Sequence, residues 1–169
     1  MSSYPHLFSP LAIRGDRFPN RIVRASLATE LCEADGSVTE AFETYYAKHA
    51  TGGAGLVMTE FASVDAVASR SFPRQLGCER DQLIPGLTRL TSLFRDTKTA
   101  VGIQLCHGGS QTRVVAEPRV ASAEAVRDVL PKARSLSVAE IHDIIESFVK
   151  AAKRARDSGF EATVSSEPE

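Results

Sequence analysis

The sequence predicts an α/β fold of the (β/α) barrel type, on three observations. Short apolar runs alternate along the chain with amphipathic helical stretches, as parallel strands alternate with the helices that cover them. Long polar segments follow the predicted strands, and in barrels those segments carry the active site. The chain has 169 residues, whereas a complete (β/α)8 TIM barrel needs roughly 250. We therefore expect a partial TIM barrel of about three and a half βα units with right-handed crossovers.

The first predicted unit occupies the N-terminal third. Residues 8–16 are interpreted as a short extended stretch that ends in a turn. Residues 22–26, an apolar run broken by one arginine, are predicted to be the first barrel strand. Thr39 is a suitable N-cap for a helix over 39–50, and the glycine at Gly52 is expected to end it.

The second and third strands are predicted at 55–59 and 100–105, where short apolar runs are bounded by helical or polar segments. Residues 63–80 show no clear periodicity and contain proline and glycine, which favours a long surface loop. A helix is predicted over 82–97 because large apolar side chains recur at helical spacing. These side chains are Leu83, Leu87, Leu90 and Phe94.

A second long loop and a last helix complete the pattern. Residues 110–136 are polar and contain two prolines, so we expect a loop there. Ser137 and Glu140 form a capping box, which predicts a helix over 137–158. Gly159 is expected to stop this helix.

Composition excludes several classes of partner. The net charge is −1 with interspersed signs, so nothing favours binding to nucleic acid or to an anionic membrane. No apolar stretch approaches 18 residues, and the N-terminus lacks the features of a secretory signal. The cysteines are odd in number and widely spaced, which favours reduced thiols over disulfides or zinc ligands. They are Cys32, Cys78 and Cys106. We expect a cytoplasmic protein.

The most informative segment is 102–109, which reads Gly-Ile-Gln-Leu-Cys-His-Gly-Gly. It predicts a buried strand with Gln104 and His107 at its carboxyl end, where polar side chains are costly unless they are needed. A glutamine there can donate and accept at once, which suits a ring with adjacent carbonyl and N–H groups such as a flavin pyrimidine. A polar strand end that merely bonds neighbouring loops remains an alternative on these residues alone. For His107 a structural role is favoured over direct contact with a flavin.

Other polar residues near strand ends have structural interpretations. Glu60 could act as a base, but an ion pair with Arg24 or Arg21 is the favoured interpretation. Arg24 is expected near the side of the first strand that would face a flavin, or in that ion pair. The pair Tyr45-Tyr46 is expected to pack on its helix. Nothing near Cys78 argues for the lowered pKa of a redox thiol.

Together, several motifs resemble Old Yellow Enzyme-type NADH:flavin oxidoreductases. Their order and spacing match that family across nearly residues 5–160. The matching motifs are Asn20-Arg21-Ile22-Val23, Tyr45-Tyr46-Ala47, Gly52-Gly53-Ala54-Gly55-Leu56, Ile84-Pro85-Gly86, Gln104-Leu105-x-His107-x-Gly109, the Ser137 capping box, and Ala151-Ala152-x-x-Ala155 running to Gly159-Phe160.

The resemblance implies an FMN-containing (β/α)8 barrel that uses NADH or NADPH to reduce the activated C=C bond of an enone or enoyl substrate. Carried over by position, it implies a set of cofactor-binding residues. The backbone after the first strand and after Glu60 would face the flavin, and a glutamine would bind its pyrimidine. These residues are Ala25, Ser26, Leu27, Phe61 and Gln104. No catalytic side chain and no metal ligand is carried over.

The chain departs from the family pattern at several positions. Ser26 stands where many members have proline, and Phe61 where a small residue is commoner. Ala28 replaces the Cys, Thr or His that tunes the flavin in other branches, and Ser110 replaces an arginine. After Glu161 the family continues with a strand bearing a substrate-binding His pair, which is missing here. The family's later arginine and phosphate-binding loops have no counterpart either.

We therefore expect residues 1–161 to be the N-terminal part of a flavin oxidoreductase barrel, with 162–169 as a divergent tail in which the fourth strand loses its register. A truncated flavin enzyme is the leading hypothesis. A catalytically inactive half-barrel that associates with another chain, or with itself through the open barrel edge, is the second. Another phosphate-binding barrel enzyme is the third.

Overall fold

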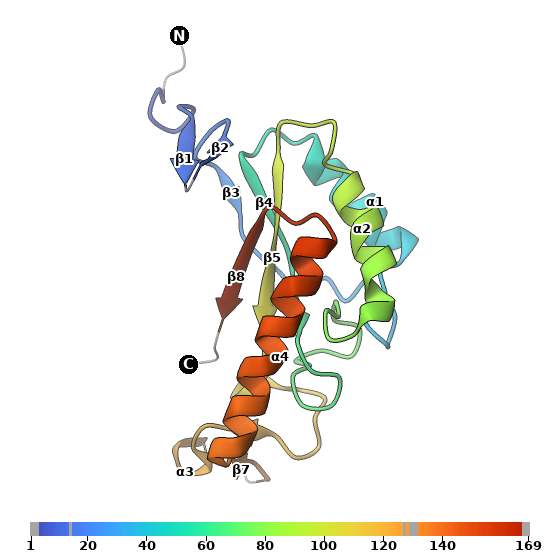
Figure 1. Ribbon diagram of the computed structural model, residues 1–169, viewed down its shortest axis with the longest axis vertical. Helices are drawn as coiled ribbons and strands as arrows, with labels where there is room; N and C mark the ends of the chain where they lie inside the picture. The colour runs from blue at the N-terminus through green and yellow to red at the C-terminus, as the bar shows by residue number, and fades with distance from the viewer. Residues whose placement is uncertain (1–3, 14, 127, 129–131, 167–169) are drawn as a thin grey trace.

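Four parallel strands form the central sheet, in the order β3-β4-β5-β8 (Figure 1). The structure is a computed structural model that describes residues 4–13, 15–126, 128 and 132–166. The strand at 100–105 pairs in parallel with one strand on each side, so the partial barrel is confirmed. The strands are β3 (Val23–Arg24), β4 (Leu56–Ser63), β5 (Ala100–Cys106) and β8 (Ala162–Ser166).

Three helices cover one face of this sheet (Figure 1). They are α1 (Glu40–Ala50), α2 (Ile84–Ser92), which follows the 3₁₀ turn η1 (Asp81–Leu83), and α4 (Val138–Asp157). The predicted caps are confirmed. Thr39 Oγ1 accepts from the Phe42 amide at 3.1 Å, and Ser137 and Glu140 form the reciprocal capping box. Gly159, at φ +90°, follows α4 in the left-handed region.

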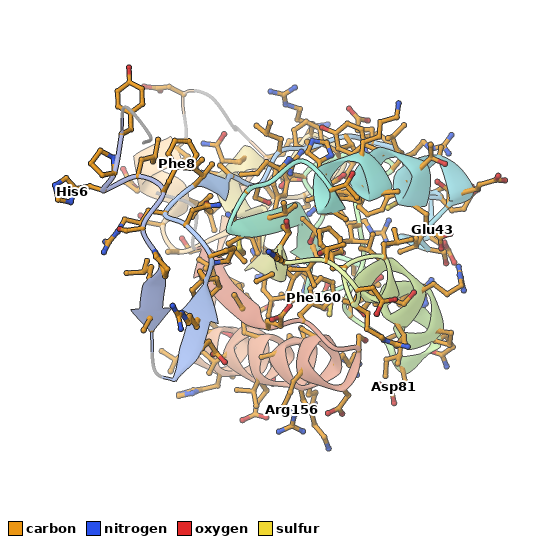
Figure 2. The ribbon with its side chains drawn as sticks, turned by 90° about the horizontal axis from the view of Figure 1, so that it is seen from above. His6, Phe8, Glu43, Asp81, Arg156 and Phe160 are labelled. Carbon is orange, nitrogen blue, oxygen red and sulfur yellow. The ribbon has the colours of Figure 1, made fainter. Side chains whose placement is uncertain are left out.

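The hydrophobic core lies between the sheet and these helices. The predicted stripe of α2 is buried, with Leu87 and Leu90 at 0% exposure. Phe42 and Tyr46 of α1 pack against each other, with ring centroids 4.7 Å apart. Viewed from above, Phe160 lies near the centre of the molecule, whereas Glu43, Asp81 and Arg156 project from its outside (Figure 2).

The opposite face of the sheet corresponds to the interior of a barrel. A Cβ placed on Gly102 would lie 2.5 Å from Met58 Sδ and 3.1 Å from Ala162 Cβ, so a larger residue here would require these neighbours to shift. In the described part of the chain, the outer strands β3 and β8 each pair with one neighbour. Val23 and Val164 on these strands are 54% and 50% exposed.

Several predicted ends shift, and the first strand spans only Val23–Arg24. The α-helical hydrogen bonds of the 82–97 helix end at Ser92, because the following amides bond three residues back and tighten the chain into turns. The extended stretch near residue 11 is a hairpin of β1 (Leu11–Ile13) and β2 (Asp16–Phe18), an antiparallel pair separate from the main sheet. Figure 1 shows this hairpin at the amino-terminal end of the sheet's strands.

A long loop follows Ser63, as expected, but its predicted place on the surface is wrong. Strand β4 continues to Ser63, and the rest of the segment is largely buried. Arg70 anchors it, because its guanidinium donates to Ala34 O and Asp35 O at 2.7 Å each. The same group pairs with Glu79 at 3.0 Å, and both side chains are at least nine-tenths buried. Buried charges are costly unless they are paired, so this pair fixes the segment against the protein.

The second expected loop, 110–136, contains short elements instead of plain coil. They are η2 (Gly109–Gln111), β6 (Arg119–Val120), α3 (Ala123–Val126) and β7 (Arg134–Ser135). Strands β6 and β7 pair in parallel, and we call the elements β6, α3 and β7 together the flap. The flap lies beside the first turns of α4, at the carboxyl ends of the sheet strands (Figure 1).

The fourth strand keeps its register, contrary to our expectation. Residues 162–166 pair with β5 in an unbroken parallel ladder from Gly102–Ala162 to Cys106–Ser166. Alternating small and β-branched residues are compatible with a strand even where the sequence diverges. Among the described residues, no helix is long and apolar enough to cross a membrane.

Candidate functional site

The carboxyl ends of the parallel strands bring three of the sequence-predicted segments together. Phe61 and Gln104 are direct neighbours in the ladder between β4 and β5, and Gln104 is paired in turn with Val164 of β8. The segment that starts at Ala25 follows β3 directly. In α/β barrels this end of the sheet is where ligands bind. We take the surroundings of Gln104 as the candidate site.

Gln104 has a carboxamide that is free to bind a ligand. The residue is half-buried on an otherwise buried strand. Among the described residues, no hydrogen bond to its side chain is found. A carboxamide offers two donors and one acceptor in a plane, so it can pair with a ring edge that carries both a carbonyl and an N–H group.

The segment Ala25–Leu27 is held beside strand β4. Ser26 Oγ donates to the carbonyl oxygen of Thr59, the residue just before Glu60. Leu27 is 59% exposed, and Ala25 is exposed as well. Ser26 therefore anchors the segment to β4, while Ala25 and Leu27 on either side of it stay exposed and accessible to a ligand.

Arg24 anchors the first strand to helix α1, and the predicted ion pair with Glu60 is wrong. Its guanidinium donates to Met58 O at 2.8 Å and to the Tyr45 hydroxyl at 2.9 Å. It also lies 5.2 Å from the centre of the Tyr46 ring, a cation–π distance. The tyrosine pair packs on its helix as predicted, and it additionally binds this cation.

Glu60 is wholly buried and binds Thr29 instead of an arginine. Its Oε2 accepts from the Thr29 amide at 2.9 Å and from the Thr29 hydroxyl at 2.5 Å. Its Oε1 has no hydrogen-bond partner among the described residues. Burial raises the pKa of Glu60, and the two bonds from Thr29 partly offset that rise. The carboxyl thus fixes the chain just beyond the Ala25–Leu27 segment, before Glu30, which has a φ of +52°.

Phe61 is fixed through its backbone and its ring. Its carbonyl oxygen accepts from Gln75 Nε2 at 3.2 Å, and its ring centroid lies 5.9 Å from that of Phe72. Gln75 is fully buried and also accepts from the Ser71 amide at 2.7 Å. We did not anticipate Gln75, because it lies in a segment without periodicity. A polar side chain next to Leu76 gave no sign of burial.

His107 closes the turn after β5. Its Nδ1 accepts from the Gly109 amide at 3.2 Å, which agrees with the structural role that the sequence favours. Burial lowers the pKa of His107, so its ring is held neutral. Burial raises the pKa of the neighbouring Cys106 thiol to about 12, and that of Cys78 to about 12. Cys78 therefore lacks the lowered pKa of a redox thiol, as predicted.

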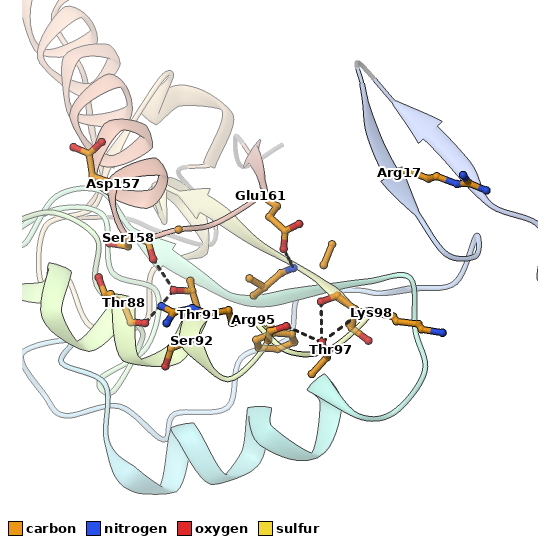
Figure 3. Close-up of a pocket in the computed structure, with 15 residues that line it drawn as sticks. Arg17, Thr88, Thr91, Ser92, Arg95, Thr97, Lys98, Asp157, Ser158 and Glu161 are labelled. Carbon is orange, nitrogen blue, oxygen red and sulfur yellow. Dashed lines mark hydrogen bonds between the residues drawn. The ribbon is translucent and has the colours of Figure 1, made fainter.

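A cavity lies at the opposite end of the sheet from Gln104, at the amino-terminal ends of the strands. It has a volume of about 560 Å³ and is bordered by Arg17 of the hairpin and by the C-terminal ends of α2 and α4 (Figure 3). Several of its polar groups are bonded to each other, as Thr91 Oγ1 is to Ser158 O at 2.6 Å. The amino-terminal ends of barrel strands serve stability, so this cavity is not our candidate site.

Known proteins are similar to this chain in sequence. The sequence profile described as the NADH:flavin oxidoreductase / NADH oxidase family matches residues 6–164. An NADPH dehydrogenase of Geobacillus sp. (strain WCH70) is 33% identical over 156 residues, which are 92% of this chain and 46% of that protein. An NADH oxidase of Thermoanaerobacter brockii is 32% identical over 171 residues, covering 95% of this chain and 25% of that protein.

Solved structures share the fold. An Old Yellow Enzyme homologue from Zymomonas mobilis superposes with a TM-score of 0.82 at 26% identity, over 95% of this chain and 48% of that one. A 2-naphthoyl-CoA reductase superposes with a TM-score of 0.88 at 20% identity, over 96% of this chain and 27% of that one. The chain thus spans about half the length of the NADPH dehydrogenases that it matches, or less in longer relatives.

Proposed function

Because the chain belongs to the NADH:flavin oxidoreductase / NADH oxidase family, we propose that it forms the flavin-ring side of an FMN-dependent NAD(P)H oxidoreductase of Old Yellow Enzyme type. The observation that carries the proposal is the unbonded carboxamide of Gln104 beside Phe61 at the carboxyl ends of the strands. The finer part of the proposal is the substrate, an enone or enoyl compound whose activated C=C bond is reduced.

The residues present fit a flavin ring. Gln104 would hold the pyrimidine edge by donating and accepting at once. The backbone of Ala25, Ser26 and Leu27 would face the ring, held in place by the bond from Ser26 to Thr59. The backbone at Phe61, fixed by Gln75, would supply a further contact. The chain's contribution is therefore to bind and orient the ring and to exclude water from one side of it.

When bound, FMN would accept a hydride from NADH or NADPH and pass it to the substrate alkene. The relatives support both reductants, since one is named an NADPH dehydrogenase and another an NADH oxidase. The described residues around Gln104 include no pair of histidines that could polarise a substrate carbonyl. We therefore assign this chain a role in holding the ring, and no role in activating the substrate.

The test is a titration of the purified chain with FMN, followed by quenching of flavin fluorescence. Gln104→Leu keeps the size of the side chain but leaves the ring edge unpaired, which should weaken binding by about 1–3 kcal/mol. Gln82→Leu is the matched control, because Gln82 is exposed on η1, far along the chain from the site. Saturable binding that is unchanged in Gln104→Leu would reject the role of Gln104.

A second candidate function is a non-catalytic half-barrel that associates through its open edges. It is favoured by the exposed valines Val23 and Val164 on the two outer strands of the sheet. Unpaired strand edges readily pair with another chain. Sedimentation equilibrium would test this candidate. Association that Val164→Lys abolishes would support it, and a monomer at all concentrations would exclude self-association.

We also propose a cytoplasmic location. It is supported by three cysteines that are free and buried, as is common where thiols stay reduced.

A further inference from the structure

A second cavity lies on the flap side of helix α4, away from the residues assigned to the flavin. Its volume is about 400 Å³, within the range of small-molecule sites. Its walls come from β6, α3 and the residue after β7 on one side and from α4 on the other. They are mainly apolar: Val120, Val126, Leu136, Ile144 and Phe148. Neither Gln104 nor Phe61 borders it.

His107 borders this cavity with a hydrogen-bond donor that has no acceptor. Its Nδ1 accepts from the Gly109 amide, so in the neutral ring the proton is on Nε2. Nε2 is buried, and no partner for it is found among the described residues. A buried donor without an acceptor is unfavourable.

Arg119 borders the cavity as well and brings a positive charge to it. It is half-buried, and no hydrogen bond or ion pair of its guanidinium is found in the described part of the chain. It also borders an adjoining recess of about 70 Å³, where Asp65, Glu140 and Asp143 lie.

Two of these three carboxylates are already bonded. Glu140 binds Arg134 at 2.6 Å and the Ser137 amide at 2.9 Å. Asp65 accepts from the amides of Val67 and Ala68 at 2.8 and 2.6 Å. Asp143, on the exposed side of α4, is the remaining acid near Arg119. Of the described residues that border the cavity itself, one is a cation and none is acidic.

We propose that this cavity binds a small apolar carboxylate, such as a medium-chain fatty acid or an aromatic acid. The hydrocarbon part lies against the valine, leucine, isoleucine and phenylalanine walls, where its burial from water drives binding. The carboxylate lies at the end bordered by His107 and Arg119, where Arg119 supplies a cation. The site is separate from the flavin site and does not depend on the proposed function.

The experiment is isothermal titration of the chain with decanoate, and with decanol as the uncharged probe of equal length. We expect saturable binding of one decanoate per chain and weaker binding of decanol. Arg119→Gln should weaken decanoate binding about tenfold or more, because it removes the charge-assisted bond. Arg113→Gln is the matched control. Like Arg119, Arg113 lies between β5 and α4 in the sequence, but its guanidinium lies over the Phe72 ring, outside the cavity.

Ile144→Trp fills the cavity and should abolish binding of both probes. Circular dichroism decides whether a variant is folded, and if Ile144→Trp is not, Arg119→Gln tests the proposal alone. The proposal is overturned by the absence of saturable binding, or by equal affinity for decanoate and decanol. It is also overturned if Arg119→Gln binds as tightly as the parent chain, since decanoate would then be adsorbing to the exposed apolar side of α4.

Discussion

Replacing Arg70 by methionine removes the cation that fixes the buried 64–80 segment to the turn at Asp35. Three interactions disappear together: two bonds of 2.7 Å to backbone carbonyls, and the 3.0 Å ion pair with Glu79. Glu79 keeps Arg80 and Ser63 as partners but loses its buried cation. Breaking a buried pair from one side costs about 3–5 kcal/mol. That is a large part of a domain's stability, which is about 5–15 kcal/mol.

The assay is urea unfolding followed by circular dichroism, with Arg74→Met as the control. Arg74 lies in the same segment, but its side chain is 51% exposed and its ion pair with Glu33 spans 4.0 Å. It keeps one strong bond, to Cys32 O at 2.7 Å. We therefore expect the control to lose about 1 kcal/mol. Equal losses for Arg70→Met and Arg74→Met would refute our assignment of Arg70 as the anchor.

Three further predictions concern Glu60, the thiols and turnover. Burial raises the pKa of Glu60 above its unfolded value, so its contribution to stability is greatest below about pH 4.3 and falls as pH rises through the folded pKa. Glu60→Gln should flatten this fall relative to the parent chain in urea unfolding at several pH values, and an unchanged profile would contradict the assignment. The three cysteines should resist Ellman's reagent at neutral pH until urea is added, because burial raises the pKa of each thiol. The chain alone should oxidise NADPH with cyclohexenone no faster than free FMN does, since no described residue near Gln104 polarises the substrate. Steady turnover above that control would show that the substrate-activating groups lie within this chain.

Hydrophobic periodicity predicted strands β3, β4 and β5 of the sheet and the three helices that pack on it. Helices α1 and α4 begin at the predicted caps, because capping depends on side chains within one turn. The apolar stripe of α2 could also be predicted, because it depends only on spacing within the helix. The strand at residues 162–166 was missed because we judged it by family pattern, whereas pairing with β5 requires only residues that tolerate an extended backbone.

The contacts that fix the candidate site were harder to predict. Gln75, Thr29 and Arg70 act through partners 14 to 36 residues away. The spacing of residues in the sequence does not predict contacts over such distances along the chain. The error at Glu60 has the same origin. Arg24 lies near the end of the first predicted strand and was therefore expected to pair with Glu60, but its guanidinium binds Tyr45 of helix α1 instead. Sequence reasoning located Gln104 and Phe61, and the ladder brings them side by side.

The most direct test of the central claim compares two flavins on the same chain. Lumiflavin has the ring of FMN without the ribityl phosphate, and our account has this chain bind the ring alone. Equilibrium dialysis should therefore give FMN and lumiflavin the same affinity, and Gln104→Leu should weaken both by the same factor. If FMN binds about tenfold tighter than lumiflavin or more, or if Gln104→Leu affects neither, the account of the site is contradicted.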